Sequence, residues 1–583
     1  MNANTDEMTC DVLIIGASMA GSCLARQLKL AHPELAITVI DKKQEFDYAI
    51  GESMLEIFWD YAANDLKLGP YLDSNHLSKH GLRFFFDSPE KNLTLSSMSE
   101  MGRAWNDSIP AHQINRKKFD EDLYHLNLKS GINVILNCGA KEITLDAESG
   151  HRVLTSDGKT IRSKWLIDAA GFNAPVARKL NLVKPIEDHS ISSRWGRFKN
   201  INVLDHLGTQ KWRERVNFNS RFLSTIHFMY KGYWFWLIPL EENLYSIGVV
   251  WRHDMVDLKI KSGSNFIEFM QSHQGIAEIL GDNFELVDYH GLKNMSRIAG
   301  QFYSTDRWFL TGMSAAFLDP LFSSGSAFLS DSNRMIMDLI ETDMAGDKQA
   351  LKNKVVCYNA HSRWWLDNFL LHIKGNYHGS YDLLRQLFEP LLMDYFGLIL
   401  PFSMTRQWGY DPTVDYGDGT ALHHHKAMMI EHGPAMRVHK ITDELAHFLK
   451  DHEGLLSNNS GHYFDLKITK SYNRHSLSRG KTLSPMAIAE LHREMLELSV
   501  SLALTRMAQS IQCHIKDEFI TMAVKAVLDQ DVSLVEAFNH CTSIDASHAY
   551  ASGPRSEIDE CHNPSNLILI QQGVGHANNA ANP

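Results

Sequence analysis

The sequence has no apolar run that approaches the ~20 residues needed for a membrane-spanning helix. Its amino terminus, residues 1–7, lacks the basic residues with which a secretory signal peptide begins. It also lacks an excess of basic charge, because the formal net charge is -12, so no nucleic-acid surface is indicated. We therefore expect a cytoplasmic protein with no membrane span and no nucleic-acid partner.

Cysteine is scarce and irregularly placed. The 7 cysteines among 583 residues show no metal-ligand spacing, a pattern typical of free thiols in a reducing compartment. Three consecutive histidines, His423 to His425, could suggest a metal site. Adjacent residues on a helix point in different directions, however, so we expect no metal ion there.

A nucleotide-binding pattern occupies the start of the chain. An apolar run at 11–15 predicts a strand buried on both faces. The turn Gly16 to Gly21 and a helical pattern follow, and a second apolar run at 36–40 ends in Asp41. In this dinucleotide-binding βαβ order the turn approaches a pyrophosphate and the acid binds ribose hydroxyls. Ser18 stands where the middle glycine is usual.

Two tryptophans, Trp234 and Trp236, lie in an aromatic run at 232–240. This run predicts a strand, and the polar turn and second run at 244–251 predict a hairpin. Alternate side chains of a strand share a face, so the two indoles should stand side by side. Taken alone, such a pair is more often core than a functional site.

Three further segments have ordinary interpretations when each is considered alone. Ser53, in Gly51-Glu52-Ser53, could cap a helix, and Lys79, before a Phe-rich run, could be a solvated charge. Arg116 lies in the first turn of a predicted helix, where it does not complement the helix dipole. That position favours an anionic partner for Arg116.

The composition, 44% hydrophobic and 22% charged, is that of a globular protein, and the length predicts two to four domain-like units. The patterns predict an α/β fold with a Rossmann-like nucleotide-binding domain at 8–180 and 300–345. A β-rich substrate-side region is predicted at 181–299 and a mostly helical region at 346–560. The tail at 561–583 is predicted to be poorly ordered.

Four features together resemble the flavin-dependent halogenases, which have an FAD monooxygenase-like fold. They are the turn Gly16 to Gly21, the segment Gly51-Glu52-Ser53, Lys79, and Trp-x-Trp-x-Ile-Pro at 234–239. The loop from Asp319 to Gly325 matches the same family. The similarity covers roughly residues 8–345, and the helical remainder looks like the longer members of the phenol and pyrrole branches. The Trp motif is the specific one, since FAD hydroxylases and reductases share the glycine turn and the loop.

The resemblance implies an FADH2-dependent enzyme that installs chloride or bromide on an electron-rich aromatic ring. In the family, reduced flavin and O2 give a C4a-hydroperoxide, and halide attack gives hypohalous acid. The acid passes to a lysine, here Lys79, which holds it as a hydrogen-bonded acid or a haloamine. A separate flavin reductase would supply FADH2, and the aromatic substrate would be free or tethered to a carrier protein.

The resemblance also implies roles for individual residues. Trp234 and Trp236 would separate the flavin from the organic substrate, and the backbone N–H groups of Ser324 and Gly325 would bind the halide. The residues implied in cofactor binding are Gly16, Ser18, Ala20, Gly21, Asp41, Glu52, Ser53, Arg116, Asp319 and Ser326.

Two positions depart from the family pattern. Phe322 stands where the tryptophan-halogenating branch has a glutamate, which favours a phenol or pyrrole over free tryptophan. Met313 follows Gly312 where FAD enzymes usually have an aspartate for the ribityl chain, so weaker FAD binding or a decayed site is expected. Two alternatives therefore stay open: an FAD-dependent aromatic hydroxylase, and an inactive flavoprotein-like binding protein.

Overall fold

The computed structural model describes residues 7–104, 110–217 and 219–377 as long segments. It also describes shorter segments at 410, 440–441, 444–445, 447–448, 463–465, 493, 496–497, 500–501, 503–505, 507–508, 515–529 and 532–551. His423 to His425 and the predicted tail at 561–583 lie outside the described residues.

The first sheet has a parallel centre. Its strands are β1 (Glu7–Ile15), β2 (Ile37–Ile40), β7 (Asn133–Ile135), β8 (Ala140–Thr144), β9 (His151–Thr155), β10 (Thr160–Asp168) and β19 (Trp308–Leu310). Their order is β7-β2-β1-β10, with β19 parallel to β10 and with β9 and β8 added by antiparallel pairing. Residues 12–15 are buried, as an apolar strand covered on both faces requires.

Two glycines allow β1 to turn closely past β10. Gly16 has φ +116°, and a Cβ there would lie 2.3 Å from the carbonyl oxygen of Ala169. A Cβ on Gly21 would lie 2.1 Å from the Gly16 carbonyl oxygen. Both distances are too short for a side chain, so the predicted glycine turn is required by packing as well as by any ligand.

The second sheet carries the tryptophan hairpin. Its strands are β4 (Leu82–Phe86), β5 (Ser99–Gly102), β12 (Ile191–Lys199), β13 (Thr225–Tyr230), β14 (Tyr233–Glu241), β15 (Leu244–Arg252), β16 (Glu285–Leu286), β17 (His290–Leu292) and β21 (Tyr463–Asp465). The order is β16-β12-β15-β14-β13-β4-β5-β21, with β17 paired to β12. The predicted hairpin is confirmed as β14 and β15. β4 and β5, which join this sheet, come from within the predicted 8–180 segment.

The two faces of β14 belong to different hydrophobic clusters. Trp234 and Trp236 pack in the large cluster shared with the first sheet, whereas Tyr233, Phe235 and Leu237 pack in a second cluster. The period of two expected for a strand therefore places both indoles on the inner side of the sheet.

The remaining elements connect and cover the sheets. The other strands are β3 (Leu77–Ser78), β6 (His112–Gln113), β11 (Val183–Pro185), β18 (Arg297–Ala299) and β20 (Ala316–Phe317). The helices are α1 (Met19–Ala31), α2 (Glu56–Asp60), η1 (Tyr61–Asp65), α3 (Gly69–Asn75), η2 (Leu95–Ser97), α4 (Arg116–Lys129), η3 (Gly171–Asn173), α5 (Pro175–Lys179), η4 (Leu204–His206), α6 (Gln210–Glu214), α7 (Gly263–Gln271), α8 (Gln274–Leu280), η5 (Gly312–Ser314), η6 (Leu321–Ser323), α9 (Ser324–Met344), α10 (Lys348–Gly375), α17 (Asp517–Asp529) and α18 (Leu534–Ala551).

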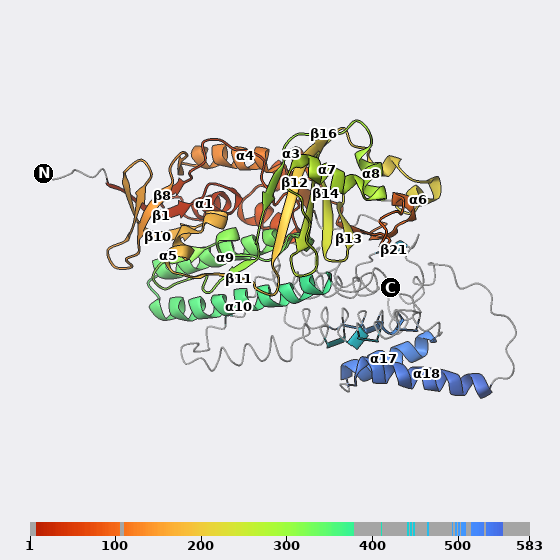
Figure 1. Ribbon diagram of the computed structural model, residues 1–583. Coiled ribbons are helices and arrows are strands. Elements are labelled where there is room, and N and C mark those ends of the chain that lie inside the picture. The colour runs from red at the N-terminus through yellow and green to blue at the C-terminus, as the bar shows by residue number, and fades with distance from the viewer. Residues whose placement is uncertain are drawn as a thin grey trace, which may run out of the picture.

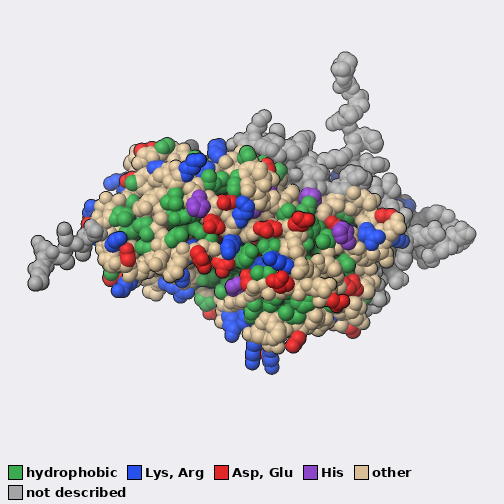
Figure 2. All heavy atoms as spheres, turned by 90° about the horizontal axis from the view of Figure 1, so that it is seen from above, with side chains coloured by type: hydrophobic (Ala, Val, Ile, Leu, Met, Phe, Trp, Pro, Cys, Tyr) green, Lys and Arg blue, Asp and Glu red, His purple; other side chains and the backbone are tan. Residues whose placement is uncertain are grey.

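The two long helices α9 and α10 lie side by side, and α9 packs against α1 and α2 (Figure 1). Farther along the chain, α17 and α18 pack against each other around a separate hydrophobic cluster. Among the described residues, no helix combines the length and the apolar character that a membrane crossing requires. On the face shown in Figure 2, acidic and basic side chains are interspersed, so this face presents no large field of one sign.

Candidate functional site

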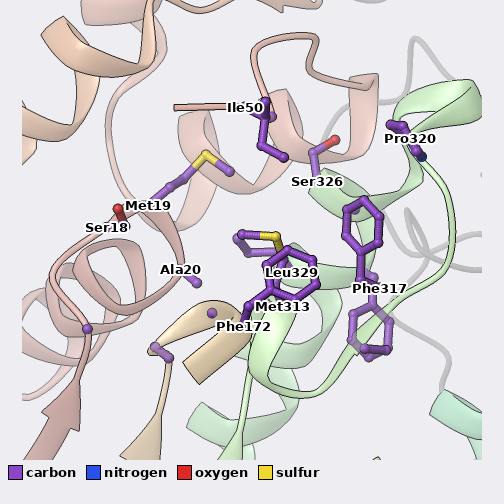
Figure 3. A pocket seen from close by; sticks show the side chains of 18 of the residues that line it. Ser18, Met19, Ala20, Ile50, Phe172, Met313, Phe317, Pro320, Ser326 and Leu329 are labelled. Atoms are coloured by element: carbon purple, nitrogen blue, oxygen red, sulfur yellow. The ribbon is translucent and has the colours of Figure 1, made fainter. Parts of the chain in front are cut away.

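A cavity of about 610 Å³ lies where the turn after β1 meets β13, β14 and the start of α9. That volume is within the usual range of cofactor sites. Figure 3 shows Met19, Ile50, Met313 and Leu329 around a common space. The predicted residues that line the cavity are Gly16, Ser18, Ala20, Asp41, Glu52, Ser53, Arg116, Trp234, Trp236, Asp319, Ser324, Gly325 and Ser326.

The nucleotide-binding turn is held by its own polar groups. The Asp41 carboxylate accepts from the Ala17 backbone N–H at 2.7 Å. The Ser18 hydroxyl donates to Asp120 at 2.9 Å and accepts from the Lys43 ammonium at 3.0 Å. The serine at the middle-glycine position is thus tied to α4, and α1 begins directly after it.

Glu52 and Arg116 are each held in a buried ion pair. Arg197 donates to Glu52 at 2.7 Å, and burial nevertheless raises the pKa of the Glu52 carboxyl. Arg116 donates to both oxygens of Asp120, at 3.1 and 2.9 Å, and to the carbonyl of Ile50 at 2.7 Å. Arg116 therefore fixes the Ile50 edge of the cavity.

Trp234 and Trp236 stand side by side on the cavity wall, with ring centroids 6.0 Å apart. Trp234 Nε1 donates to the Tyr377 hydroxyl at 2.6 Å, and Trp236 Nε1 donates to the Ser246 hydroxyl at 3.1 Å. A Cβ on Gly248, which faces Trp236 across the ladder, would lie 2.2 Å from the indole ring. The glycine makes room for the indole, so the pair is both buried and fixed in orientation.

The loop before α9 has an unusual backbone. Phe322 and Ser323 have φ angles of 67° and 59°, in the left-handed region that non-glycine residues rarely occupy. Residues with such a backbone cluster at functional sites. Ser324 returns to the right-handed region and begins α9. Successive left- and right-handed residues at a helix start turn their N–H groups toward one side, which makes a concave site for an anion.

Asp319 anchors this loop from within the core. One carboxylate oxygen accepts from His189 Nε2 at 2.9 Å and from the Tyr377 hydroxyl at 2.8 Å, and the other accepts from the Leu321 N–H at 2.9 Å. Tyr377, which follows α10, therefore joins the loop to Trp234.

Lys79 lies outside the cavity lining and is 3% exposed, so the interpretation as a solvated charge is wrong. Its Nζ donates to the Met54 carbonyl at 2.9 Å, and Met54 itself lines the cavity. Burial lowers the pKa of the Lys79 ammonium to about 8, although the charge of Glu56 opposes the shift. The lysine is thus held directly behind the cavity wall.

The sequence interpretation missed a polar seam in this wall. The Ser323 hydroxyl donates to Ser53 at 3.0 Å, the hydroxyls of Ser53 and Thr225 are 2.6 Å apart, and Gln113 Nε2 donates to Thr225 at 2.9 Å. Ser53 is therefore not a helix cap, and the predicted helix begins only at Glu56 and passes into a π-helical turn. In the sequence, this seam could have been found from Thr225 and His227, two polar residues at alternate positions of an otherwise apolar run.

The two departures from the family pattern both lie at the site. Phe322 packs edge-on against Phe84 and Phe369, with ring centroids 6.2 Å apart in each case. Met313 and Leu329 both line the cavity (Figure 3). Phe322, in an aromatic cluster, therefore occupies the position of the family's glutamate. The thioether of Met313 occupies the position of the aspartate that binds the ribityl chain. Within the described residues, no cluster of side chains is suited to hold a metal ion.

Comparison with known proteins adds three findings. A family model described as lycopene cyclase protein matches residues 11–185. The flavin-dependent halogenase chlA of Dictyostelium discoideum is 26% identical over 462 residues, 71% of this chain and 74% of that protein. The chain resembles the flavin-dependent halogenases. A 1H-pyrrole-2-carbonyl peptidyl-carrier-protein brominase of Pseudoalteromonas luteoviolacea is 24% identical over 347 residues, 58% of this chain and 78% of that halogenase.

The solved structures agree with this resemblance at the level of fold. The crystal structure of halogenase PltM matches with a TM-score of 0.59 and 16% identity, and the match covers 93% of this chain and 96% of that one. The predicted resemblance, the α/β fold class and the enzyme class are thereby confirmed.

Proposed function

We propose that this chain is an FADH2-dependent halogenase that installs chloride or bromide on an electron-rich aromatic ring of the phenol or pyrrole type. The observation that carries the proposal is Lys79, a buried lysine with a lowered pKa behind the wall of a cavity that begins at a dinucleotide-binding turn. The resemblance to named flavin-dependent halogenases supports the cofactor and the reaction class.

The residues at the nucleotide end of the cavity fit FAD. The glycine turn leaves the first N–H groups of α1 available for a pyrophosphate, and Asp41 lies at the end of β2, where it can bind a ribose hydroxyl. Met19, Ile50 and Leu329 offer the apolar surface that a flavin ring needs. Met313 offers no carboxylate for the ribityl chain, so we expect modest affinity, suited to FADH2 that arrives by diffusion.

Reduced FAD together with O2 would supply the oxidising equivalent that converts halide to hypohalous acid. The N–H groups of Ser324 and Gly325 would bind the halide at the concave start of α9. Trp234 and Trp236 would keep the organic substrate from the cofactor, because they close the cavity on the side of the second sheet.

Lys79 would present the halogen to the substrate. With a pKa of about 8, part of the Lys79 population is neutral in mildly alkaline solution, so both a hydrogen-bonded hypohalous acid and a haloamine are accessible. In halogenation by the acid, a carbon–halogen bond forms, the oxygen–halogen bond breaks, and the released hydroxide takes the ring proton as water. Phe322 supplies no carboxylate to activate the ring, so the substrate must be activated by its own hydroxyl or pyrrole nitrogen.

Two partners follow from the proposal. A separate flavin reductase would supply FADH2, because the nucleotide-binding turn described above belongs to a single βαβ unit. The name of the related pyrrole brominase specifies a peptidyl-carrier-protein substrate. The aromatic substrate of this chain would therefore be either free or tethered to a carrier protein, and both forms should be assayed.

The test is turnover with purified chain, FAD, an NADH-dependent flavin reductase, O2, chloride or bromide, and a panel of phenols and pyrroles. Halogenated product that depends on halide and on the reductase is expected. The proposal fails if the chain oxidises NAD(P)H by itself and gives an oxygenated product without halide, as a hydroxylase would. It also fails if a flavin titration shows no binding.

A further inference from the structure

The wall between the cavity and Lys79 contains a histidine that the mechanism above does not use. His227 is 1% exposed, lines the cavity, and pairs in register with Trp236 across the ladder between β13 and β14. Its ring stacks on Phe84 at 4.6 Å between centroids and lies 5.4 Å from the ring of Trp234. The imidazole is therefore fixed in the aromatic part of the wall.

The hydrogen bonding of His227 defines its tautomer. Nδ1 lies 3.3 Å from the carbonyl oxygen of Arg83, and a carbonyl can only accept, so Nδ1 carries the proton. Nε2 then carries the lone pair, and within the described residues no donor bonds to it. The imidazole is thus an acceptor without a protein donor.

Burial keeps this ring neutral. Burial and, to a smaller extent, the charge of Lys79 lower the pKa of the His227 imidazole to about 3, although the carbonyls of Arg83 and Thr225 oppose the shift. The two residues are linked through the wall, because Lys79 bonds to the Met54 carbonyl and the adjacent Ser53 bonds to Thr225, two residues before His227 on β13. His227 can therefore accept a hydrogen bond throughout the ordinary pH range.

The hydroxyls beside His227 already donate to other protein groups. The hydroxyls of Ser53, Thr225 and Ser323 bond to one another or to Gln113. Lys79 Nζ donates to the Met54 carbonyl. A small molecule that leaves the cavity toward Lys79 therefore passes His227 Nε2, a ring nitrogen whose lone pair is not bonded by a donor within the described residues.

We infer that His227 is a catalytic residue that accepts a hydrogen bond from hypohalous acid as the acid passes from the cavity to Lys79. The inference deepens the proposed halogenase function and rests on it. Hypohalous acid has one O–H donor and a terminal halogen, so a lone pair that holds the O–H leaves the halogen free to face Lys79. No bond forms or breaks at His227, and the acid arrives at the lysine intact.

Two substitutions at this position separate the acceptor from the ring. His227→Phe keeps a flat ring on Phe84 but removes both nitrogens, whereas His227→Gln removes the ring and keeps an acceptor near the place of Nε2. The measured quantity is halogenated product per reduced flavin consumed, with free hypohalous acid trapped in solution by a β-diketone. His227→Phe should lower the ratio about tenfold and raise the trapped acid, as the loss of one hydrogen bond predicts. His227→Gln should keep most of the ratio.

The matched control is His273→Phe. His273 is also fully buried with a pKa lowered to about 3 by burial, but it bonds to the Tyr233 hydroxyl at 2.9 Å on the opposite face of the sheet. This variant should lose stability and keep the wild-type ratio. The inference is overturned if folded His227→Phe keeps the wild-type ratio, if folded His227→Gln falls tenfold, or if His273→Phe falls equally. A wild-type chain that makes neither product nor trapped acid contradicts the proposed function itself.

Discussion

Lys79 should weaken the fold at neutral pH, because its pKa is about 8 in the folded chain against an ordinary value of 10.5. Below pH 8 both states are protonated and the folded state bears the full burial penalty, about 3 kcal/mol. Between pH 8 and 10.5 the unfolded chain binds the proton and the folded chain does not, so stability rises with pH. Lys79→Met should thus be more stable than wild type at pH 7, by an amount that shrinks toward pH 10.5. Urea unfolding at both pH values measures this, and a pH-independent difference would refute the lowered pKa.

The tryptophan wall makes a second prediction at the scale of single residues. Trp234→Phe keeps an aromatic ring but deprives the Tyr377 hydroxyl of its 2.6 Å donor and opens space beside the cavity. We expect the variant to fold and to lose coupling, with more flavin oxidised per halogenated product. The measurement is O2 consumed against product formed. Unchanged coupling would show that Trp234 is only a core residue, as a tryptophan on a strand usually is.

At the scale of elements, the end of α10 is tied to the loop before α9 by one hydroxyl. Tyr377 donates to Asp319 at 2.8 Å, and Tyr377→Phe would leave both Asp319 and Trp234 with one partner fewer. A loss of about 1–3 kcal/mol in unfolding free energy is expected, together with weaker halide dependence. Tyr358→Phe is the control, since it removes a hydrogen bond from α10 to Asp338 away from the site. Equal effects of both variants on halide dependence would show that Tyr377 only stabilises the helix.

Arg334 joins helix α9 to α2 and η1, because it donates to Asp60 at the end of α2 at 2.7 Å and to Asp65 at the end of η1 at 2.6 Å. Removing the guanidinium leaves two carboxylates without their cation, so Arg334→Leu should destabilise the chain by about 3–5 kcal/mol. Arg363→Leu breaks the exposed pair with Asp367 on α10 and should change stability by less than about 1 kcal/mol. Chemical denaturation of both variants measures this contrast. Similar losses of unfolding free energy would show that burial does not determine the contribution of the Arg334 ion pairs.

At the scale of the whole molecule, the sequence predicted what local periodicity determines. The buried strand before Gly16, the acid that follows the second strand, and the hairpin with Trp234 and Trp236 on one face were all visible, because each needs only neighbouring residues. The left-handed backbone at Phe322 and Ser323 was not visible, since neither residue type prefers it. The tertiary fold imposes it.

Contacts between distant segments also lay beyond the sequence. His227 reaches the wall because β13 pairs in parallel with β4, a strand far earlier in the chain. Tyr377 reaches Asp319 because α10 packs along α9. Glu52 accepts a hydrogen bond from Arg197, which lies 145 residues later in the sequence. Residue identity suggested that such polar groups have roles, but partners so distant in sequence follow only from the completed fold.

The most direct test of the account compares Lys79→Ala with wild type in the presence of FADH2, O2, halide and a phenol or pyrrole substrate. The proposed function has the lysine act after the oxidant forms and before the ring reacts, so the variant should still consume reduced flavin and release trappable hypohalous acid. Its yield of halogenated product should fall at least about a hundredfold. A Lys79→Ala chain that halogenates at the wild-type rate would contradict the account.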